Sequence, residues 1–192
     1  MLLLRLAWTP GAAGVPACAE AARAFAQRCR PALAVQRVAV SSEAALALVY
    51  FEQAQQTAPA DFAAAFVAAN PWCTSAEGLW LEPVFDAAGA SAQAPARFHY
   101  VVETDPEDGW FDEISRWYDE EHMPGLASVP GCIHAWRYLN RSGNGPVSFA
   151  CYDLASEDTL GSPAWLAVRH TAWSDRARPH FTNTRRTLFR VV

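Results

Sequence analysis

The sequence predicts an α+β protein made of two βαββαβ repeats whose sheets face each other. Three observations predict it: the same order of strand and helix patterns occurs twice, the two copies share a register of proline and aromatic positions, and a stretch rich in Ala, Gly and Ser separates them. With 192 residues, 52% of them hydrophobic, the chain can build a sizeable core. We expect an N-terminal repeat at residues 1–86, a linker at 86–96 and a C-terminal repeat at 96–192.

The elements of the first repeat follow from apolar runs and the breakers between them. A buried strand ends at Thr9-Pro10-Gly11, and a helix with one apolar face runs from Pro16 until Pro31 stops it. A Ser-Ser-Glu link between two apolar runs indicates a hairpin. The expected elements are strand 2–8, a helix from 16, strands 35–40 and 45–51, helix 59–69 and strand 78–85.

The second repeat shows the same order of patterns. Ser162 is expected to cap a helix with Pro163 at its first position, and Pro124-Gly125 to end a longer helix just after His122. A shift of 93 residues carries Pro31 onto Pro124, which predicts an internal duplication. The expected elements are strand 97–104, helix 108–122, strands 132–139 and 147–154, the capped helix, a short helix near 176–180 and strand 186–192.

The helix at 108–122 carries the main candidate site, because its apolar face ends in a histidine. At 100° per residue this face holds Phe111, Ile114, Tyr118 and His122. An imidazole at a helix C-terminus can act as a cap, but it can also exchange protons near neutral pH. Tyr118 lies one turn earlier and could orient His122 or bond only to the backbone. We predict His122 and Tyr118 as catalytic residues at the mouth of a lumen between the two sheets.

Alternation along two strands of the second repeat separates a helix side from a lumen side. The helix side is expected to hold Phe98, Tyr100, Val102, Ile133, Ala135 and Arg137. The lumen side then holds polar and aromatic side chains that could contact a flat ligand, unless the faces are reversed or side chains fill the space. The predicted ligand-binding residues are His99, His134, Trp136 and Tyr138.

The two repeats differ at the positions that matter for chemistry. Where the second repeat has Tyr118 and His122, the first has Phe25 and Cys29. We therefore expect the first repeat to be a structural partner, with Cys29 buried and unreactive.

Composition excludes several classes of function. The net charge of -5 gives no general affinity for nucleic acid or membrane, and five of the fifteen cationic residues, interpreted as local ion pairs, gather in 176–190. All fifteen are arginine, which excludes a lysine Schiff base. Five cysteines without a Cys-x-x-Cys pair argue against disulfides and zinc, and no apolar run is long enough to span a membrane. We expect a cytoplasmic bacterial protein without metal or cofactor.

Residues 116–126, Arg-Trp-Tyr-Asp-Glu-Glu-His-Met-Pro-Gly-Leu, resemble the aromatic-rich helix ending in His-x-Pro of EthD-like proteins. Ser-Pro-Ala-Trp at 162–165 and Arg-Pro-His-Phe at 178–181 resemble the closing part of uncharacterised bacterial relatives. The resemblance implies the dimeric α+β barrel superfamily, in which ferredoxin-like units pair through their sheets, here as a tandem repeat in a single chain. The topology match covers the whole chain, but the motif match covers only its second half.

Two functional interpretations from different classes remain open. The first is a cofactor-independent enzyme that acts on a small aromatic or carbonyl-bearing molecule, with His122 as general acid or base. The second is a non-catalytic ligand-binding or stress-associated module; a weaker alternative is a haem-binding protein with histidine as the axial ligand. We expect a small-molecule ligand as partner, no nucleic acid, no membrane, and either a monomer with an internal pseudo-dimer or a homodimer of it.

Overall fold

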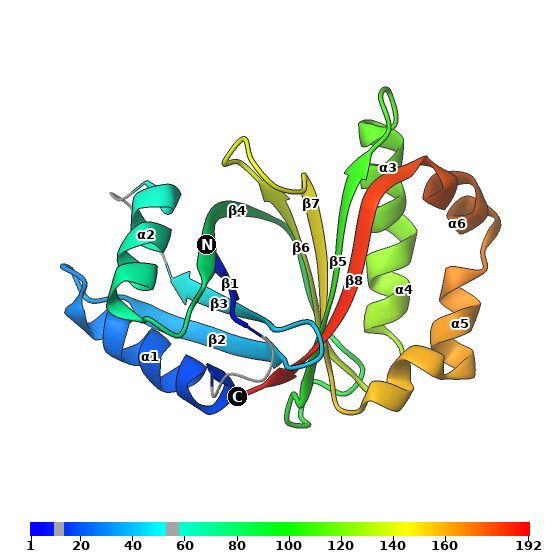
Figure 1. The fold of residues 1–192 in the computed structure, drawn as a ribbon. Helices are drawn as coiled ribbons and strands as arrows, with labels where there is room; N and C mark the ends of the chain where they lie inside the picture. The colour runs from blue at the N-terminus through cyan, green and yellow to red at the C-terminus, as the bar shows by residue number, and fades with distance from the viewer. Residues whose placement is uncertain (10–13, 53–57) are drawn as a thin grey trace. The chain divides into compact units, whose positions relative to one another are not determined.

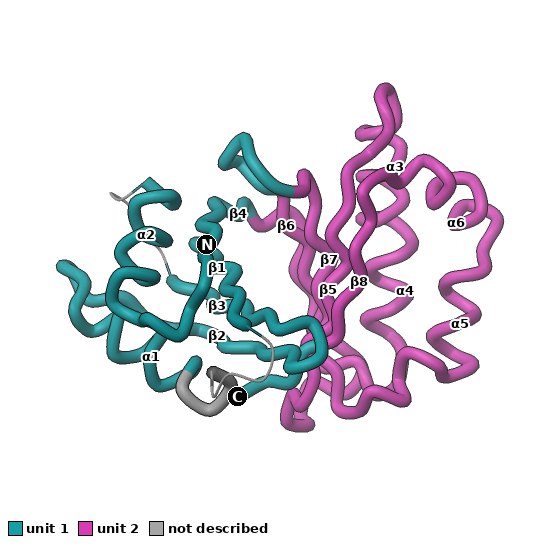
Figure 2. The backbone as a smooth tube through the Cα atoms, in the orientation of Figure 1, with its two compact units in different colours: residues 1–82, 140–145, 189–192 teal, residues 83–139, 146–188 magenta. Residues whose placement is uncertain are grey.

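The computed structural model describes residues 1–9, 14–52 and 58–192, with the side chains of 14–17 left undescribed. The chain forms two compact units, which Figure 2 shows in different colours. Unit 1 comprises residues 1–82, 140–145 and 189–192, and unit 2 comprises residues 83–139 and 146–188. The predicted turn at Pro10-Gly11 lies outside the described residues. That the two halves are duplicated repeats packed sheet to sheet stays a prediction.

Unit 1 contains two helices and an antiparallel sheet. The strand order is β4-β1-β3-β2, with the last residues of β8 beside β2. In Figure 1, α1 and α2 lie on the same side of β2 and β3. The elements are β1 (Leu2–Ala7), α1 (Gly14–Arg28), β2 (Ala34–Ser41), β3 (Leu46–Glu52), α2 (Pro59–Ala69) and the first part of β4 (Ser75–Ala88).

Phenylalanine rings fill the space between the helices and the sheet of unit 1. The ring of Phe25 meets those of Phe62 and Phe66 edge to face, each with centroids 5.1 Å apart. Cys29 was expected to be buried, but it is only half-buried, because α1 ends at Arg28 and leaves the cysteine at the rim of this core. Its thiol donates to the carbonyl of Phe25 at 3.5 Å, and burial raises its pKa.

Unit 2 pairs its strands in the order β8-β5-β7-β6-β4, with β5 and β6 both antiparallel to β7. Figure 1 shows α3, α4 and α5 on one face of this sheet. The elements are β5 (Phe98–Pro106), α3 (Phe111–Trp117), the π-helix η1 (Tyr118–His122), α4 (Met123–Ala127), β6 (Cys132–Asn140), β7 (Ser148–Leu154), the 3-10 helix η2 (Glu157–Gly161), α5 (Pro163–Arg169), α6 (Ala172–Ala177), the 3-10 helix η3 (Arg178–His180) and β8 (Phe181–Val191).

The long helix of unit 2 does not end after His122, so that prediction is wrong. The backbone N–H of Met123 bonds to the carbonyl of Tyr118, five residues earlier, and the helix continues to Ala127. Pro124 lacks an N–H and is tolerated because it lies in the first turn of α4, directly after this wide π turn. Phe111 is also wrongly placed on the buried face: it lies at the start of α3 and is 38% exposed.

The expected linker at 86–96 is partly strand and partly packed turn. β4 continues to Ala88, and the N–H groups of Gly89 and Ser91 bond to the carbonyls of Ile133 and Cys132 at 2.9 and 2.8 Å. A Cβ on Gly89 would lie 2.2 Å from the carbonyl oxygen of Cys132. The small residues that resemble a linker in the sequence therefore allow close backbone approach.

Capping residues determine where the helices near the end of unit 2 begin. The Ser162 side chain accepts from the N–H of Trp165 at 3.2 Å, which confirms the predicted cap. The extra helix begins at Ala172 instead of near Arg176, because the Thr171 side chain accepts from the N–H of Ser174 at 3.0 Å.

Candidate functional site

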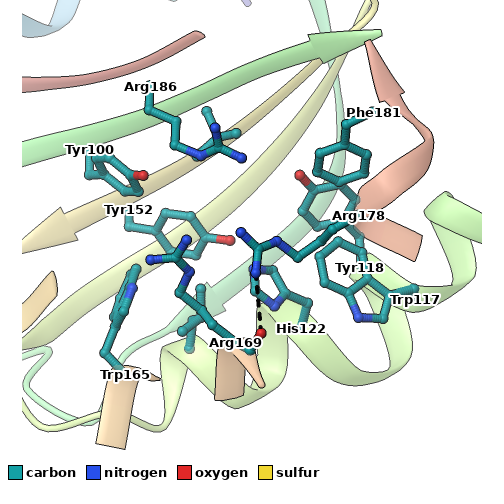
Figure 3. A pocket seen from close by; sticks show the side chains of 12 residues that line it. Tyr100, Trp117, Tyr118, His122, Tyr152, Trp165, Arg169, Arg178, Phe181 and Arg186 are labelled. Carbon is teal, nitrogen blue, oxygen red and sulfur yellow. Dashed lines mark hydrogen bonds between the residues drawn. The ribbon is translucent and has the colours of Figure 1, made fainter. Parts of the chain in front are cut away.

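A small cavity lies between the helices and the sheet of unit 2 (Figure 3). Its volume is about 30 Å³, and a buried water needs roughly 10–15 Å³ on this measure. The helical wall is Trp117, Tyr118, His122 and Leu126; the sheet supplies Tyr100, Val102, Tyr152, Phe181 and Arg186; and Trp165, Arg169 and Arg178 close the remaining side. The cavity can therefore enclose only a few atoms of a ligand.

The π turn brings the aromatic residues of the helix together. The rings of Trp117 and His122 stack with centroids 4.2 Å apart and planes 23° apart. Residues five apart point in different directions on a regular α-helix, roughly 140° apart, but a π turn brings them onto one side. Tyr118 meets His122 edge to face, with centroids 5.7 Å apart. The local widening of the helix thus holds the imidazole between an indole and the cavity.

His122 carries a polar atom that the described residues leave unsatisfied. Its Nδ1 is buried and has no hydrogen-bond partner among them. Burial, followed by the charges of Arg178 and Arg169, lowers its pKa to about 3, so the imidazole is neutral at pH 7. The capping interpretation is wrong, because the helix continues past His122 and the ring is uncharged. A buried unsatisfied nitrogen requires another explanation.

Three tyrosines add hydroxyl groups to the same space. Figure 3 shows the phenol oxygens of Tyr100, Tyr118 and Tyr152 directed toward the centre of the cavity. Burial raises the pKa of all three, so each hydroxyl keeps its proton. The hydroxyl of Tyr152 donates to the sulfur of Met123 at 2.9 Å, a weak acceptor. The tyrosines are therefore available as neutral hydrogen-bond donors.

Three arginines from separate elements reach the cavity. Arg169 ends α5, Arg178 lies in η3 and Arg186 lies on β8, and Figure 3 shows their guanidinium groups gathered over the tyrosines. One guanidinium nitrogen of Arg178 donates to the backbone carbonyl of Arg169 at 3.3 Å. No aspartate or glutamate of the described chain lines the cavity, and none forms an ion pair with these three arginines. Burial and the charges of Arg169 and Arg186 lower the pKa of Arg178.

Acidic residues of α3 and η1 hold α5 and α6 in place from outside the cavity. The hydroxyl of Thr171 donates to Glu121 at 2.6 Å, and the indole N–H of Trp173 donates to Glu113 at 3.0 Å. Close helix packing adds to this, since a Cβ on Gly125 would lie 2.8 Å from Cγ1 of Val168. These contacts fix the segment that carries Arg169 and Arg178.

The predicted ligand-binding residues lie elsewhere in unit 2 and do not line this cavity. His99 is fully buried, and its Nδ1 lies 2.7 Å from Asp153. His134 pairs with Asp86 at 2.8 Å and stacks on Trp136, with ring centroids 4.0 Å apart. Tyr138 is buried. Their role in binding stays a prediction, and the structure groups none of them with His122.

Arg137 and Tyr100 lie on the face of the sheet that the helices cover, as predicted, but this face contributes polar groups as well as a core. Arg137 donates to Asp119 at 3.0 Å and to Ser115 at 2.8 Å on the covering helix. Tyr100 and Val102, expected to serve only packing, line the cavity. The polar site therefore lies under the helices, where only a core was expected.

Sequence reasoning missed the three arginines of the cavity. For two of them, Arg178 and Arg186, the signal was the cluster of cationic residues at 176–190, which was interpreted as local ion pairs; Arg169 lies outside this cluster. That interpretation holds for Arg176, paired with Glu113, and for Arg185, paired with Glu103. It is wrong for Arg178 and Arg186, which face the cavity instead.

Unit 1 has a wider but less specific depression of about 500 Å³. Its wall includes three alanines of α2 and Gly78 and Trp80 of β4. Two charged side chains line it, and both are already paired, Arg141 with Glu82 and Glu77 with Arg5. Asn144 also donates to Glu77 at 3.0 Å. No unsatisfied polar group of the described chain points into it, so it is the weaker candidate.

Metal and membrane sites receive no support from the described residues. Within residues 1–9, 14–52 and 58–192, no three His, Cys, Asp or Glu side chains are grouped so that they could hold a metal ion. None of the helices described is both long and apolar enough to cross a membrane.

No protein-family model matches the sequence, and no curated protein is significantly similar to it. Solved structures do share the fold. A chlorite dismutase variant from Candidatus Nitrospira defluvii aligns with a TM-score of 0.67 at 11% identity, over 100% of this chain and 91% of that one. An anthrone oxidase-like protein gives 0.61 at 14% identity, over 100% and 90%. LmHde, a heme-degrading enzyme from Listeria monocytogenes, gives 0.52 at 7% identity, over 97% and 98%.

The chain therefore shares its overall fold with these three proteins. At such low identities the similarity shows the fold alone. It is a fold that binds or transforms small molecules in the proteins compared. What this chain binds has to be argued from its own residues.

Proposed function

We propose that this protein, as an EthD-like member of the superfamily, binds a small aromatic or carbonyl-bearing molecule beside His122 and exchanges a proton with it. The observation that carries the proposal is the buried Nδ1 of His122, which has no partner among the described residues and belongs to a ring that lines the cavity. A ligand that offers a hydrogen bond to this nitrogen would offset the cost of leaving it unsatisfied.

The neutral imidazole supports the role of base more than that of acid in the free protein. Its lone pair can accept a proton from a carbon next to a carbonyl group, and the tyrosine hydroxyls can donate to the carbonyl oxygen as it gains charge. The rings of Tyr118 and His122 meet edge to face. We therefore assign Tyr118 to positioning the imidazole and donating its hydroxyl to the ligand.

Hydrogen exchange on a simple ketone tests both halves of the proposal. Acetophenone is incubated with the protein in deuterium oxide, binding is followed by chemical shifts, and deuterium in the methyl group is measured by mass. His122 would take a methyl proton to give the enolate, and a deuteron from solvent would return to carbon. We expect exchange above the buffer rate, lost in His122→Ala and kept in His134→Ala.

Each result separates the remaining interpretations. Binding that needs His122 without exchange would favour the non-catalytic module. Binding that survives His122→Ala but not His134→Ala would place the ligand on the other face of the sheet, beside Asp86 and Trp136, and would contradict the proposal.

Haem is suggested by a neighbour's name but does not fit this cavity. An unpartnered imidazole nitrogen is a suitable axial ligand for iron. However, pockets for drug-sized ligands measure roughly 300–1,000 Å³, against about 30 Å³ here, and Trp117 covers one face of His122. We expect no Soret absorption band when the purified protein is titrated with haemin.

We also propose that the protein is cytoplasmic and that it is either a monomer or a homodimer. A single chain with an internal pseudo-dimer, or a homodimer of it, agrees with the dimeric barrels that share its fold. Light scattering coupled to size exclusion distinguishes the two assemblies.

A further inference from the structure

We propose that the ligand of this cavity carries an oxyanion, a carboxylate or a phosphate group, which Arg169, Arg178 and Arg186 bind at the cavity mouth. The inference rests on the proposed function for the location of the ligand. It adds the ligand's charge and its orientation.

The first argument is the convergence of like charges. Guanidinium groups from α5, η3 and β8 are directed into one space, and no described carboxylate pairs with any of them. Like charges that gather without a counter-ion cost free energy, which an anion between them offsets. Guanidinium forks suit this role, because they bind carboxylate and phosphate oxygens through paired hydrogen bonds.

The second argument is that nearby arginines outside the cavity form ion pairs with carboxylates. Arg176 pairs with Glu113, Arg185 with Glu103, and Arg137 with Asp119. Those three carboxylates are thus used by arginines outside the cavity. Among the described residues, Asp175 acts on Arg178 from a distance but forms no ion pair with it, so the three arginines that line the cavity can attract a negatively charged group from solution.

The third argument comes from the gradient of exposure across the cavity. Arg186 is exposed, Arg169 and Arg178 are half-buried, and His122 and Tyr152 are buried. An acidic group held by the arginines would lie outermost, and the opposite end of the ligand would reach His122. Because the enclosed space is about 30 Å³, that inner end is a small group such as a carbonyl or hydroxyl oxygen. Short oxo-acids, hydroxy-acids and their phosphate analogues fit this description.

The test compares probes of equal shape and different charge. Binding of pyruvate, its neutral amide pyruvamide, and inorganic phosphate to the whole chain is measured by calorimetry at pH 7 and low salt. We expect pyruvate to bind at least about tenfold more tightly than pyruvamide, a ratio typical of losing one charge-assisted contact. The ratio of pyruvate to phosphate affinity then identifies which oxyanion the site prefers.

Arginine variants connect this binding to the cavity. Arg186→Met is the first choice, because this side chain is exposed and its loss should leave the fold intact. We expect it to weaken pyruvate or phosphate binding at least about tenfold. Arg141→Met, which removes one charge from an exposed pair with Glu82, is the matched control and should change the affinity less than about twofold.

The outcomes separate this inference from the proposed function. Anion binding that needs Arg186 but not His122 supports the inference and removes the proton-exchange role. Equal affinity for pyruvate and pyruvamide, or no effect of Arg186→Met, overturns the inference even if His122 is needed. Failure of both anions to bind the parent protein at roughly 10 mM also overturns it.

Discussion

In unit 1, apolar side chains fill the space between the helices and the sheet. In unit 2, the same kind of space contains polar side chains and a cavity. In unit 1, Phe25 packs edge to face with Phe62 and Phe66. In unit 2, the layer between the helices and the sheet contains Tyr118, His122 and a cavity. Unit 1 thus fills this layer with apolar rings, whereas unit 2 places polar groups in it.

The unsatisfied polar groups of unit 2 cost free energy of folding. Nδ1 of His122 and the indole nitrogen of Trp117 are both buried without a partner among the described residues. An unsatisfied buried group costs roughly 1–3 kcal/mol, whereas phenylalanine rings at such positions would cost nothing of this kind. Stability alone does not explain these side chains, which is why we assign them to binding.

The largest expected effect tests the filled core of unit 1. Phe66 is fully buried, and Phe66→Ala should lower the free energy of unfolding by about 3–5 kcal/mol through lost burial and a new cavity. Urea denaturation measures it. Phe111→Ala, at a 38% exposed position, is the control and should cost less than about 1 kcal/mol. A small loss for Phe66→Ala would mean that this core is not tightly packed.

The next effect concerns acid sensitivity of unit 2. The folded pKa of His122, about 3, lies below its ordinary value near 6.5, so between these values the unfolded chain binds more protons and stability falls as pH falls. His122→Phe removes this titration. Between pH 7 and pH 5 the parent should lose about 2 kcal/mol more than the variant. Equal losses in urea unfolding would show that His122 titrates normally in the folded protein.

A smaller effect tests how closely α4 and α5 pack. Gly125→Ala places a methyl group 2.8 Å from the present position of Cγ1 of Val168, so the Val168 side chain, or α5 with it, has to shift. We expect a loss of about 1–3 kcal/mol in thermal unfolding, together with weaker pyruvate binding because Arg169 moves with α5. Gly161→Ala is a suitable control, since its added methyl group would meet no atom within 4 Å.

The substitution expected to change stability least gives the most direct test of the comparison between the two units. His122→Phe at pH 7 gives the layer under the helices of unit 2 an apolar ring in place of the imidazole, and replacing an unsatisfied polar ring by an apolar ring of similar shape should change stability by less than about 1 kcal/mol. Ligand binding should be lost. A destabilisation of several kcal/mol, with binding intact, would show that the imidazole is structural.

Much of the fold was predictable, because breakers and apolar periods are local signals. The cap at Ser162 and the buried Tyr118 and His122 could be recognised in this way. The π turn could not, since a constant rotation of 100° per residue does not place Trp117 beside His122.

The arginines of the cavity were harder to predict for a different reason. Arg169, Arg178 and Arg186 lie on different elements, and only tertiary structure shows that Arg178 and Arg186 share a cavity while Arg176 and Arg185 form ion pairs. A sequence count of cationic residues does not separate the two groups. The faces of the strands were easier, as the contacts of Arg137 show.

The π turn at Tyr118–His122 also bears on how such a site could arise during evolution. A π turn holds one residue more than an α-helical turn, so its presence depends on helix length as well as on side-chain identity. Substitution at single positions of a regular helix would not stack residues five apart. In a lineage of related chains, insertion or deletion of one residue is therefore the event that would create or remove the Trp117–His122 stack, and with it the placement of the imidazole.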